Sequence, residues 1–82
     1  MAEYNMQPGL RAERSDTVTD NNTAKAYGSG GVAVYATPAM IGLMENAALS
    51  AVDPLLPDGM ATVGTELNVK HLAATPRGMK VR

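Results

Sequence analysis

The 82-residue sequence contains no cysteine, no phenylalanine and no tryptophan, and it has a single histidine. The lack of cysteine excludes a disulfide framework, a thiolate nucleophile and a cysteine metal site. One histidine without any cysteine gives no credible zinc site, so we expect no bound metal. A chain without cysteine is compatible with a reducing compartment, and we expect a cytoplasmic protein.

An excess of charge of one sign is also lacking. Seven Lys and Arg residues face eight Asp and Glu residues, which gives a formal net charge of −1. Nucleic acids and anionic membrane surfaces need a strong cationic patch, so neither is an expected partner. The sequence has no apolar run approaching the ~18 residues that a membrane span needs, and its polar start lacks the apolar core of a signal peptide.

With three tyrosines as its aromatic residues, the chain must build its core from Val, Leu, Ile, Met and Ala. A chain of this length forms one domain at most. It buries only about 60–65% of the surface that its unfolded form exposes. We therefore expect a partner subunit to add to the core.

A helix is predicted to start at Thr37-Pro38, because threonine is a good N-cap and proline is favoured at the first helical position. Apolar residues then follow a helical period. They are Met40, Leu43, Met44, Ala47, Ala48 and Ala51. The flanks are apolar as well, so the sequence predicts a buried central helix. It should end near Asp53-Pro54, since the residue before proline resists the α conformation.

The remaining signals predict strands. Residues 10–19 end in β-branched side chains and are read as a strand after a loose lead-in over residues 1–9. Residues 60–73 alternate over a long stretch, with Val63, Leu67, Val69 and His71 on the face toward the core. Residues 79–82 begin another strand. The order predicts an α+β class with an antiparallel sheet packed against one helix.

Two polar residues have mainly apolar neighbours. Glu45 lies among Ile41, Ala48 and Leu49 on the helix, so it is either in a pocket or interface, or at a helix edge with its head in water. His71 lies on the apolar face of the long strand, as a core residue or as a catalyst. Together they could form a general acid/base pair.

Thr37 and Gly64 are further candidates, each with a plain alternative. Thr37 is explained by helix capping, but the free N–H groups at a helix start could also bind a thioester carbonyl that gains negative charge. Gly64 marks a bulge or a close approach of a ligand or backbone. The glycines of residues 28–31 fit neither a dinucleotide fingerprint nor a P-loop, and no serine sits in a nucleophile elbow.

Two segments resemble a known family. Residues 35–45, YATPAMIGLME, resemble the helix-start segment of the hotdog-fold acyl-CoA thioesterases in the fluoroacetyl-CoA thioesterase-like group. Residues 64–78, GTELNVKHLAATPRG, resemble the second motif of the same group. The resemblance runs from about Leu10 to the C-terminus.

The resemblance implies a hotdog fold, in which an antiparallel sheet wraps one central helix. It also implies a homodimer or larger homo-oligomer with active sites at the subunit interface, an acyl-CoA substrate, and no cofactor beyond the coenzyme A of the substrate. Glu45 would be the nucleophile or the base that activates water, and His71 its acid/base partner. The implied site residues are Thr37, Glu45 and His71 for catalysis, and Gly64, Pro38 and Ala39 for substrate binding.

Two departures qualify these expectations. Fluoroacetyl-CoA-specific members carry Gly-Phe after the threonine and Trp after the glutamate, where this chain has Pro38, Ala39 and Asn46. A small or medium acyl-CoA of another kind is therefore the expected substrate. Domains of the group also continue with further strands, so residues 10–82 are expected to form a partial hotdog domain that is not a stable monomer.

The alternatives to a thioesterase are a non-catalytic hotdog module that binds acyl-CoA or only assembles, and an inactive fragment. A lyase or hydratase on the same fold fits the motifs less well.

Overall fold

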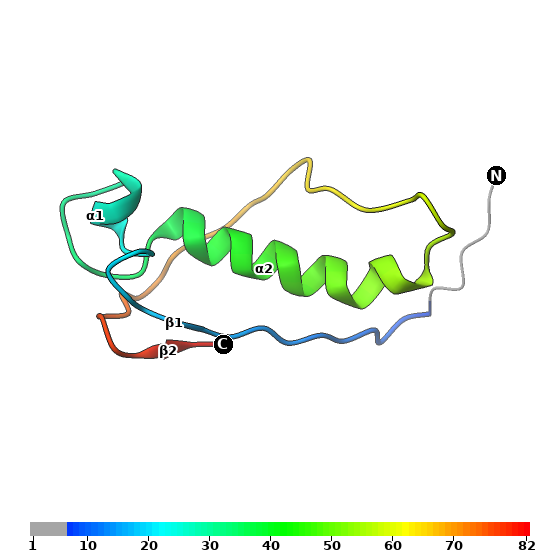
Figure 1. The fold of residues 1–82 in the computed structure, drawn as a ribbon, viewed down its shortest axis with the longest axis horizontal. Coiled ribbons are helices and arrows are strands. Elements are labelled where there is room, and N and C mark those ends of the chain that lie inside the picture. The colour runs from blue at the N-terminus through cyan, green and yellow to red at the C-terminus, as the bar shows by residue number, and fades with distance from the viewer. Residues whose placement is uncertain (1–6) are drawn as a thin grey trace.

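The computed structural model describes residues 7–82, so residues 1–6 of the predicted lead-in lie outside the described residues. The molecule is elongated, with extents of 47 × 22 × 21 Å, and one long helix runs along it (Figure 1). The elements are β1 (Asp16–Thr17), α1 (Ala24–Tyr27), α2 (Thr37–Val52), the 3-10 turn η1 (Asp53–Leu55) and β2 (Lys80–Val81).

The helix α2 confirms the predicted helix and both of its ends. It ends at Val52, and Pro54 belongs to the 3-10 turn that follows. The prediction for Thr37 was wrong in one respect, because Ala36, with φ −72° and ψ 139°, is the N-cap residue. Ala36 has no side-chain oxygen to accept a helix-start N–H, whereas the Thr37 hydroxyl contacts another segment.

The prediction of a buried helix was also wrong. No residue of α2 is fully buried. Two extended segments, residues 7–15 and residues 60–74, flank α2 on opposite sides (Figure 1). Two single segments cannot cover an apolar helix, so α2 is central in the molecule but half-exposed.

The strands are much shorter than predicted. β1 pairs antiparallel with β2 in the register Asp16↔Val81 and Thr17↔Lys80. Val18 extends this pairing, since its N–H donates to the Met79 carbonyl at 2.8 Å. The strand start in residues 79–82 is therefore confirmed, whereas only two residues of the predicted strand 10–19 form a ladder. Residues 10–15 lie along α2 without a strand partner in the described chain.

The long strand predicted over residues 60–73 does not form. Residues 63–72 make no backbone–backbone hydrogen bond within residues 7–82. On the face predicted to point inward, Val63 is 83% exposed, whereas Val69 and His71 are half-buried. Leu72, which follows His71, is 88% exposed. A strand needs a neighbour to pair with, and this extended segment has a helix beside it.

A small core lies at the start of α2. Its buried residues are Val18, Thr23, Tyr35 and Ala36. The sequence analysis missed α1, whose N-cap Thr23 accepts a hydrogen bond from the Ala26 N–H and whose C-cap Gly28 is left-handed at φ 69°. Isolated bridges join Thr23 to Tyr35 and Val34 to Pro76. The most deeply buried residues therefore lie next to Thr37, on which the candidate site is built.

Candidate active site

Thr37 and His71 lie together at the start of α2. The Thr37 Oγ1 atom is 2.8 Å from the His71 Nδ1 atom, and the tautomer of the imidazole decides which of them donates. Thr37 is exposed at the first position of the helix, and His71 is half-buried on the extended segment. The contact joins two residues that are far apart in the sequence but were both predicted to be catalytic.

The backbone around this pair is held by further hydrogen bonds. The Tyr35 N–H donates to the Thr75 carbonyl at 2.8 Å, two residues before Thr37 and four residues after His71. The bridge between Val34 and Pro76 continues the same contact. The segments that carry Thr37 and His71 are therefore tied together next to the small core.

Glu45 and Gly64 form a second close contact. A Cβ atom built on Gly64 would lie 2.1 Å from Glu45 Oε2 and 3.2 Å from Glu45 Cδ. Only glycine leaves room for the carboxylate here, because real Cβ atoms do not approach that closely. The sequence predicted a bulge or the close approach of a ligand or of backbone at Gly64, whereas the group that lies close is a side-chain carboxylate.

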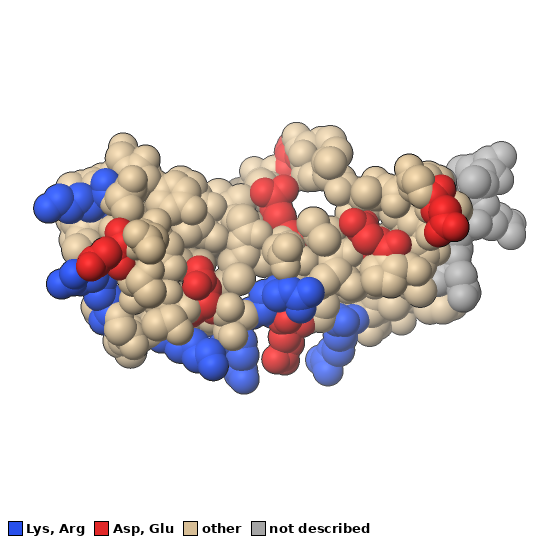
Figure 2. Space-filling model, viewed as in Figure 1, with Lys and Arg blue, Asp and Glu red and all other residues tan. Residues whose placement is uncertain are grey.

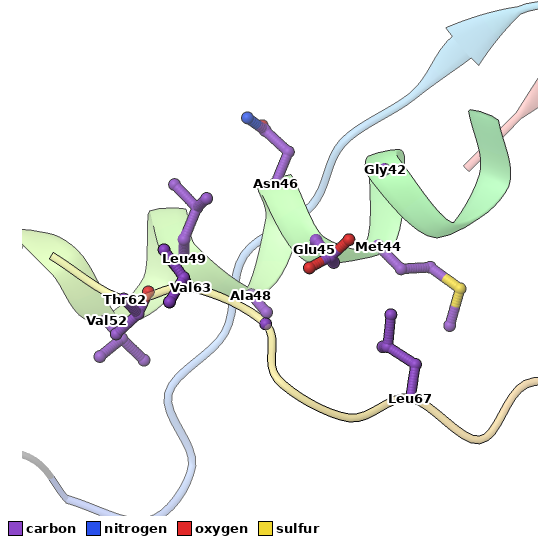
Figure 3. A pocket seen from close by; sticks show the side chains of 11 residues that line it. Gly42, Met44, Glu45, Asn46, Ala48, Leu49, Val52, Thr62, Val63 and Leu67 are labelled. Atoms are coloured by element: carbon purple, nitrogen blue, oxygen red, sulfur yellow. The ribbon is translucent and has the colours of Figure 1, made fainter. Parts of the chain in front are cut away.

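Glu45 lines a groove between α2 and the extended segment. The groove is formed by Gly42, Met44, Glu45, Asn46, Ala48, Leu49, Val52, Thr62, Val63, Gly64 and Leu67. Figure 3 shows the carboxylate between the labelled side chains of α2 and Leu67 of the facing segment, with Leu49, Val52 and Val63 further along. Figure 2 shows an opening between the two segments in this region. Glu45 is half-buried in this groove, not fully in water.

The two contacts are separate in this chain. Thr37 and Glu45 are eight residues apart in α2, or about 12 Å along its axis at about 1.5 Å per residue. Within residues 7–82, no hydrogen bond joins Glu45 to Thr37 or His71. The structure therefore brings Thr37 to His71 and Glu45 to Gly64, but it does not bring the acid to the histidine.

The predicted substrate-binding residues Pro38 and Ala39 lie in the first turn of α2. Pro38 is exposed, and Ala39 is half-buried. The helix makes no side-chain cap bond at Ala36, and its first N–H to bond within the helix is that of Met40, to the Ala36 carbonyl at 3.0 Å. Within residues 7–82, the N–H groups of Thr37 and Ala39 are thus left for an external acceptor.

A partly buried polar contact beside the site was not predicted from the sequence. The Tyr35 hydroxyl donates to Asp16 Oδ2 at 2.9 Å and lies 3.3 Å from the Ala39 carbonyl oxygen. Burial, and then the neighbouring Asp16 carboxylate, raise the pKa of Tyr35 to about 12. A tyrosine in an apolar run just before the helix start was the available signal, because a buried phenol needs a hydrogen-bond partner.

Two further findings concern the described part of the chain. Residues 7–82 contain no group of three or more His, Asp or Glu side chains that could hold a metal ion. None of the helices described there is long and apolar enough to cross a membrane.

Comparison with known proteins now decides the family. The sequence pattern of the family described as FlK, fluoroacetyl-CoA-specific thioesterase, matches residues 18–82. The chain belongs to this family. A curated relative, the fluoroacetyl-CoA thioesterase of Streptantibioticus cattleyicolor, is 48% identical over 48 residues, which are 58% of this chain and 34% of the relative.

Solved structures support the same assignment. A structure of the fluoroacetyl-CoA thioesterase FlK has a TM-score of 0.81 and 34% identity, covering 92% of this chain and 60% of FlK. A threonine-to-alanine mutant of FlK with fluoroacetate gives 0.80 and 33%, covering 92% and 61%. A phenylalanine-to-alanine mutant with fluoroacetate and CoA gives 0.81 and 34%, covering 92% and 65%.

These likenesses confirm the predicted hotdog fold. The chain spans about a third of the curated relative in the matched region and less than two thirds of the FlK chains of known structure.

Proposed function

We propose that this chain carries the site of an acyl-CoA thioesterase that hydrolyses a small or medium acyl-CoA. The contact between Thr37 Oγ1 and His71 Nδ1, at 2.8 Å, is the observation that carries the proposal. It joins two of the three residues that the family resemblance implies for catalysis. The third, Glu45, lies on the same helix as Thr37 and lines an apolar groove. A carboxylate that acts on an acyl group should lie in such a groove.

The proposed reaction uses one water molecule. Glu45 takes a proton from the water while the oxygen attacks the thioester carbonyl carbon, and the C–S bond then breaks. The proton that Glu45 took from the water is passed to His71, which delivers it to the sulfur, so the products are a carboxylic acid and the free thiol of coenzyme A and both side chains are restored. Glu45 attacking the carbonyl itself, with water then opening the resulting anhydride, gives the same products.

Thr37 and the helix start have supporting roles in this proposal. The Thr37 hydroxyl holds the His71 imidazole through Nδ1, which leaves Nε2 to face the substrate. The N–H groups of the first turn can donate hydrogen bonds to the carbonyl oxygen as it gains negative charge, because they donate to no acceptor within the helix. Coenzyme A enters only as part of the substrate, and the proposal needs no other cofactor and no metal.

We further propose that the working site is completed by a second copy of the chain. About 12 Å of helix axis lies between Thr37 and Glu45, and no hydrogen bond within residues 7–82 joins Glu45 to His71, so one described copy does not unite the three residues in one proton-transfer site. Residues 63–72 are extended and have no backbone partner in the described chain, so they form a free edge that another strand can pair with. A homodimer or larger homo-oligomer in the cytoplasm is the assembly that we propose.

Thiol release from a panel of acyl-CoAs tests the proposal. Short, branched and aromatic acyl-CoAs are incubated with the chain, and the free thiol of coenzyme A is measured against spontaneous hydrolysis. We expect turnover of at least one of them. A folded, oligomeric sample that turns over none of the panel would contradict the proposal.

A non-catalytic assembly module is the second candidate, and the unpaired edge of residues 63–72 favours it. Such a module would form stable oligomers, and it would bind acyl-CoA with saturation or not at all, but it would release no thiol.

A further inference from the structure

A partly buried hydrogen-bond network connects β1 to the first turn of α2. Its centre is the Asp16 carboxylate on β1. The Tyr35 side chain is only 2% exposed, and its hydroxyl donates to Asp16 Oδ2 at 2.9 Å. The same hydroxyl lies 3.3 Å from the carbonyl oxygen of Ala39. This first arm of the network therefore ends two residues after Thr37.

A second arm ends on the other side of Thr37. The Asn22 side-chain amide donates to Asp16 Oδ2 at 3.3 Å and to the Thr17 carbonyl at 2.9 Å. The Asn22 backbone carbonyl accepts the N–H of Ala36 at 2.9 Å. Ala36 is the N-cap of α2 and is fully buried. Both arms thus start at one carboxylate and enclose the exposed threonine between them.

We propose that Asp16 and Tyr35 are positioning residues that hold Thr37 in place against His71. This inference rests on the proposed thioester hydrolysis. The helix start has no side-chain cap of its own, so the position of its first turn depends on the two arms. The Tyr35 N–H also holds the Thr75 carbonyl on the segment of His71.

The two residues act through Thr37 and take no part in proton transfer. The Tyr35 side chain is buried, and its hydroxyl keeps its proton at neutral pH, since its pKa is raised to about 12. Its effect on the reaction is therefore geometric. A misplacement of about 1 Å in a reacting group can reduce turnover by up to about 100-fold.

The variant Tyr35→Phe tests the proposal, because it removes only the hydroxyl. We expect kcat for thiol release to fall about tenfold while KM stays within about twofold, since the substrate pocket is unchanged. The matched control is Tyr27→Phe, which makes the same change at a side chain that is 53% exposed at the end of α1. Its kcat should equal that of the wild type.

Asp16→Asn provides a second variant with the same readout, at a half-exposed position where failure to fold is less of a risk. Combining it with Tyr35→Phe should reduce kcat little further than either change alone, because both break one network. Fully additive losses would mean that the two residues act separately, and would contradict the proposal.

The imidazole gives a readout that does not depend on turnover. His71 is the only histidine, so its ring ¹⁵N signals are unambiguous. We expect Tyr35→Phe, but not Tyr27→Phe, to shift the Nδ1 signal toward that of Thr37→Val, which lacks the hydroxyl.

If kcat and the Nδ1 signal both stay at wild-type values while only the melting temperature falls, the network is merely structural. If no protein turns over substrate, the proposed function fails, and the Nδ1 signal still decides the positioning role.

Discussion

At the residue scale, the contact between Glu45 and Gly64 determines where the carboxylate can lie. The sequence predicted both residues, since an acid in an apolar helix and a glycine in an alternating segment are visible without a structure. It did not show that they meet each other, because that depends on the path of residues 60–73 along α2. The pairing of Thr37 with His71 could likewise not be read from spacing, and the residues alone left Thr37 open between helix capping and a role at the site.

Gly64→Ala should displace the Glu45 carboxylate. A new Cβ would lie 2.1 Å from Oε2, so the side chain must leave its place in the groove. We expect thiol release to fall at least tenfold with little loss of stability, because the end of a flexible side chain moves and the backbone does not. The control is Gly31→Ala, where an added Cβ meets nothing within 4 Å. Wild-type kinetics in Gly64→Ala would show that the position of the Glu45 carboxylate next to Gly64 does not matter for the reaction.

At the scale of elements, a feature that depends on one continuous segment could be predicted from the sequence, whereas the pairing of two segments could not. Helix α2 was predicted because its apolar period and the prolines at both ends are properties of one continuous segment. Residues 60–73 have an equally clear period, yet no strand forms, because a ladder needs a second strand at about 4.8 Å. The four-residue helix α1 was overlooked, although Thr23 and Gly28 are its cap signals. The hydrogen bonds by which Tyr35 connects Asp16 of β1 to Ala39 of α2 could not be predicted from the sequence either.

The buried Tyr35 phenol, bonded to Asp16 of β1, predicts a loss of stability at high pH. Tyr35 has a pKa of about 12 in the folded chain and an ordinary value of 10.0. Its stabilising contribution is complete below pH 10, where both states are protonated. It is lost as the pH rises toward 12, since the unfolded chain ionises first. The free energy of unfolding should fall by up to about 3 kcal/mol across this range, at about 1.4 kcal/mol per pKa unit.

Denaturant midpoints at pH 9 and at pH 11.5 measure this effect. Tyr35→Phe serves as the reference, because every other titrating group remains in it. The wild type should lose more stability than the variant over this interval. Equal losses in the two proteins would mean that the buried phenol is not coupled to folding.

At the scale of the whole molecule, the apolar surface is incompletely covered. Val63 and Leu72 are more than four-fifths exposed, and α2 has no fully buried residue. Figure 2 shows Lys and Arg with Asp and Glu at the left end and along the lower edge, and only Asp and Glu at the upper right. The formal net charge of the chain is −1, so little net charge keeps copies apart. Exposed apolar side chains on an unpaired extended segment favour self-association.

Val63→Lys should weaken this association. A charge on the groove side of residues 63–72 would have to be desolvated when a second copy pairs there. We expect a lower oligomer mass by light scattering at equal concentration. Val32→Lys is the matched control, because Val32 is also exposed, at 62%, but lies in the loop before α2. A wild-type chain that runs as a sharp monomer at high dilution and unfolds cooperatively would contradict the assembly altogether.

The central claim is that Glu45 is the general base or the nucleophile of a thioester-hydrolysing site, and one comparison tests it most directly. Thiol release is measured for the wild type, for Glu45→Gln and for Glu66→Gln, which makes the same change at an exposed carboxylate of the extended segment. The account predicts that turnover in Glu45→Gln falls by at least about 100-fold, the usual scale for a lost general base, while Glu66→Gln keeps the wild-type rate. Equal turnover in all three proteins would contradict it.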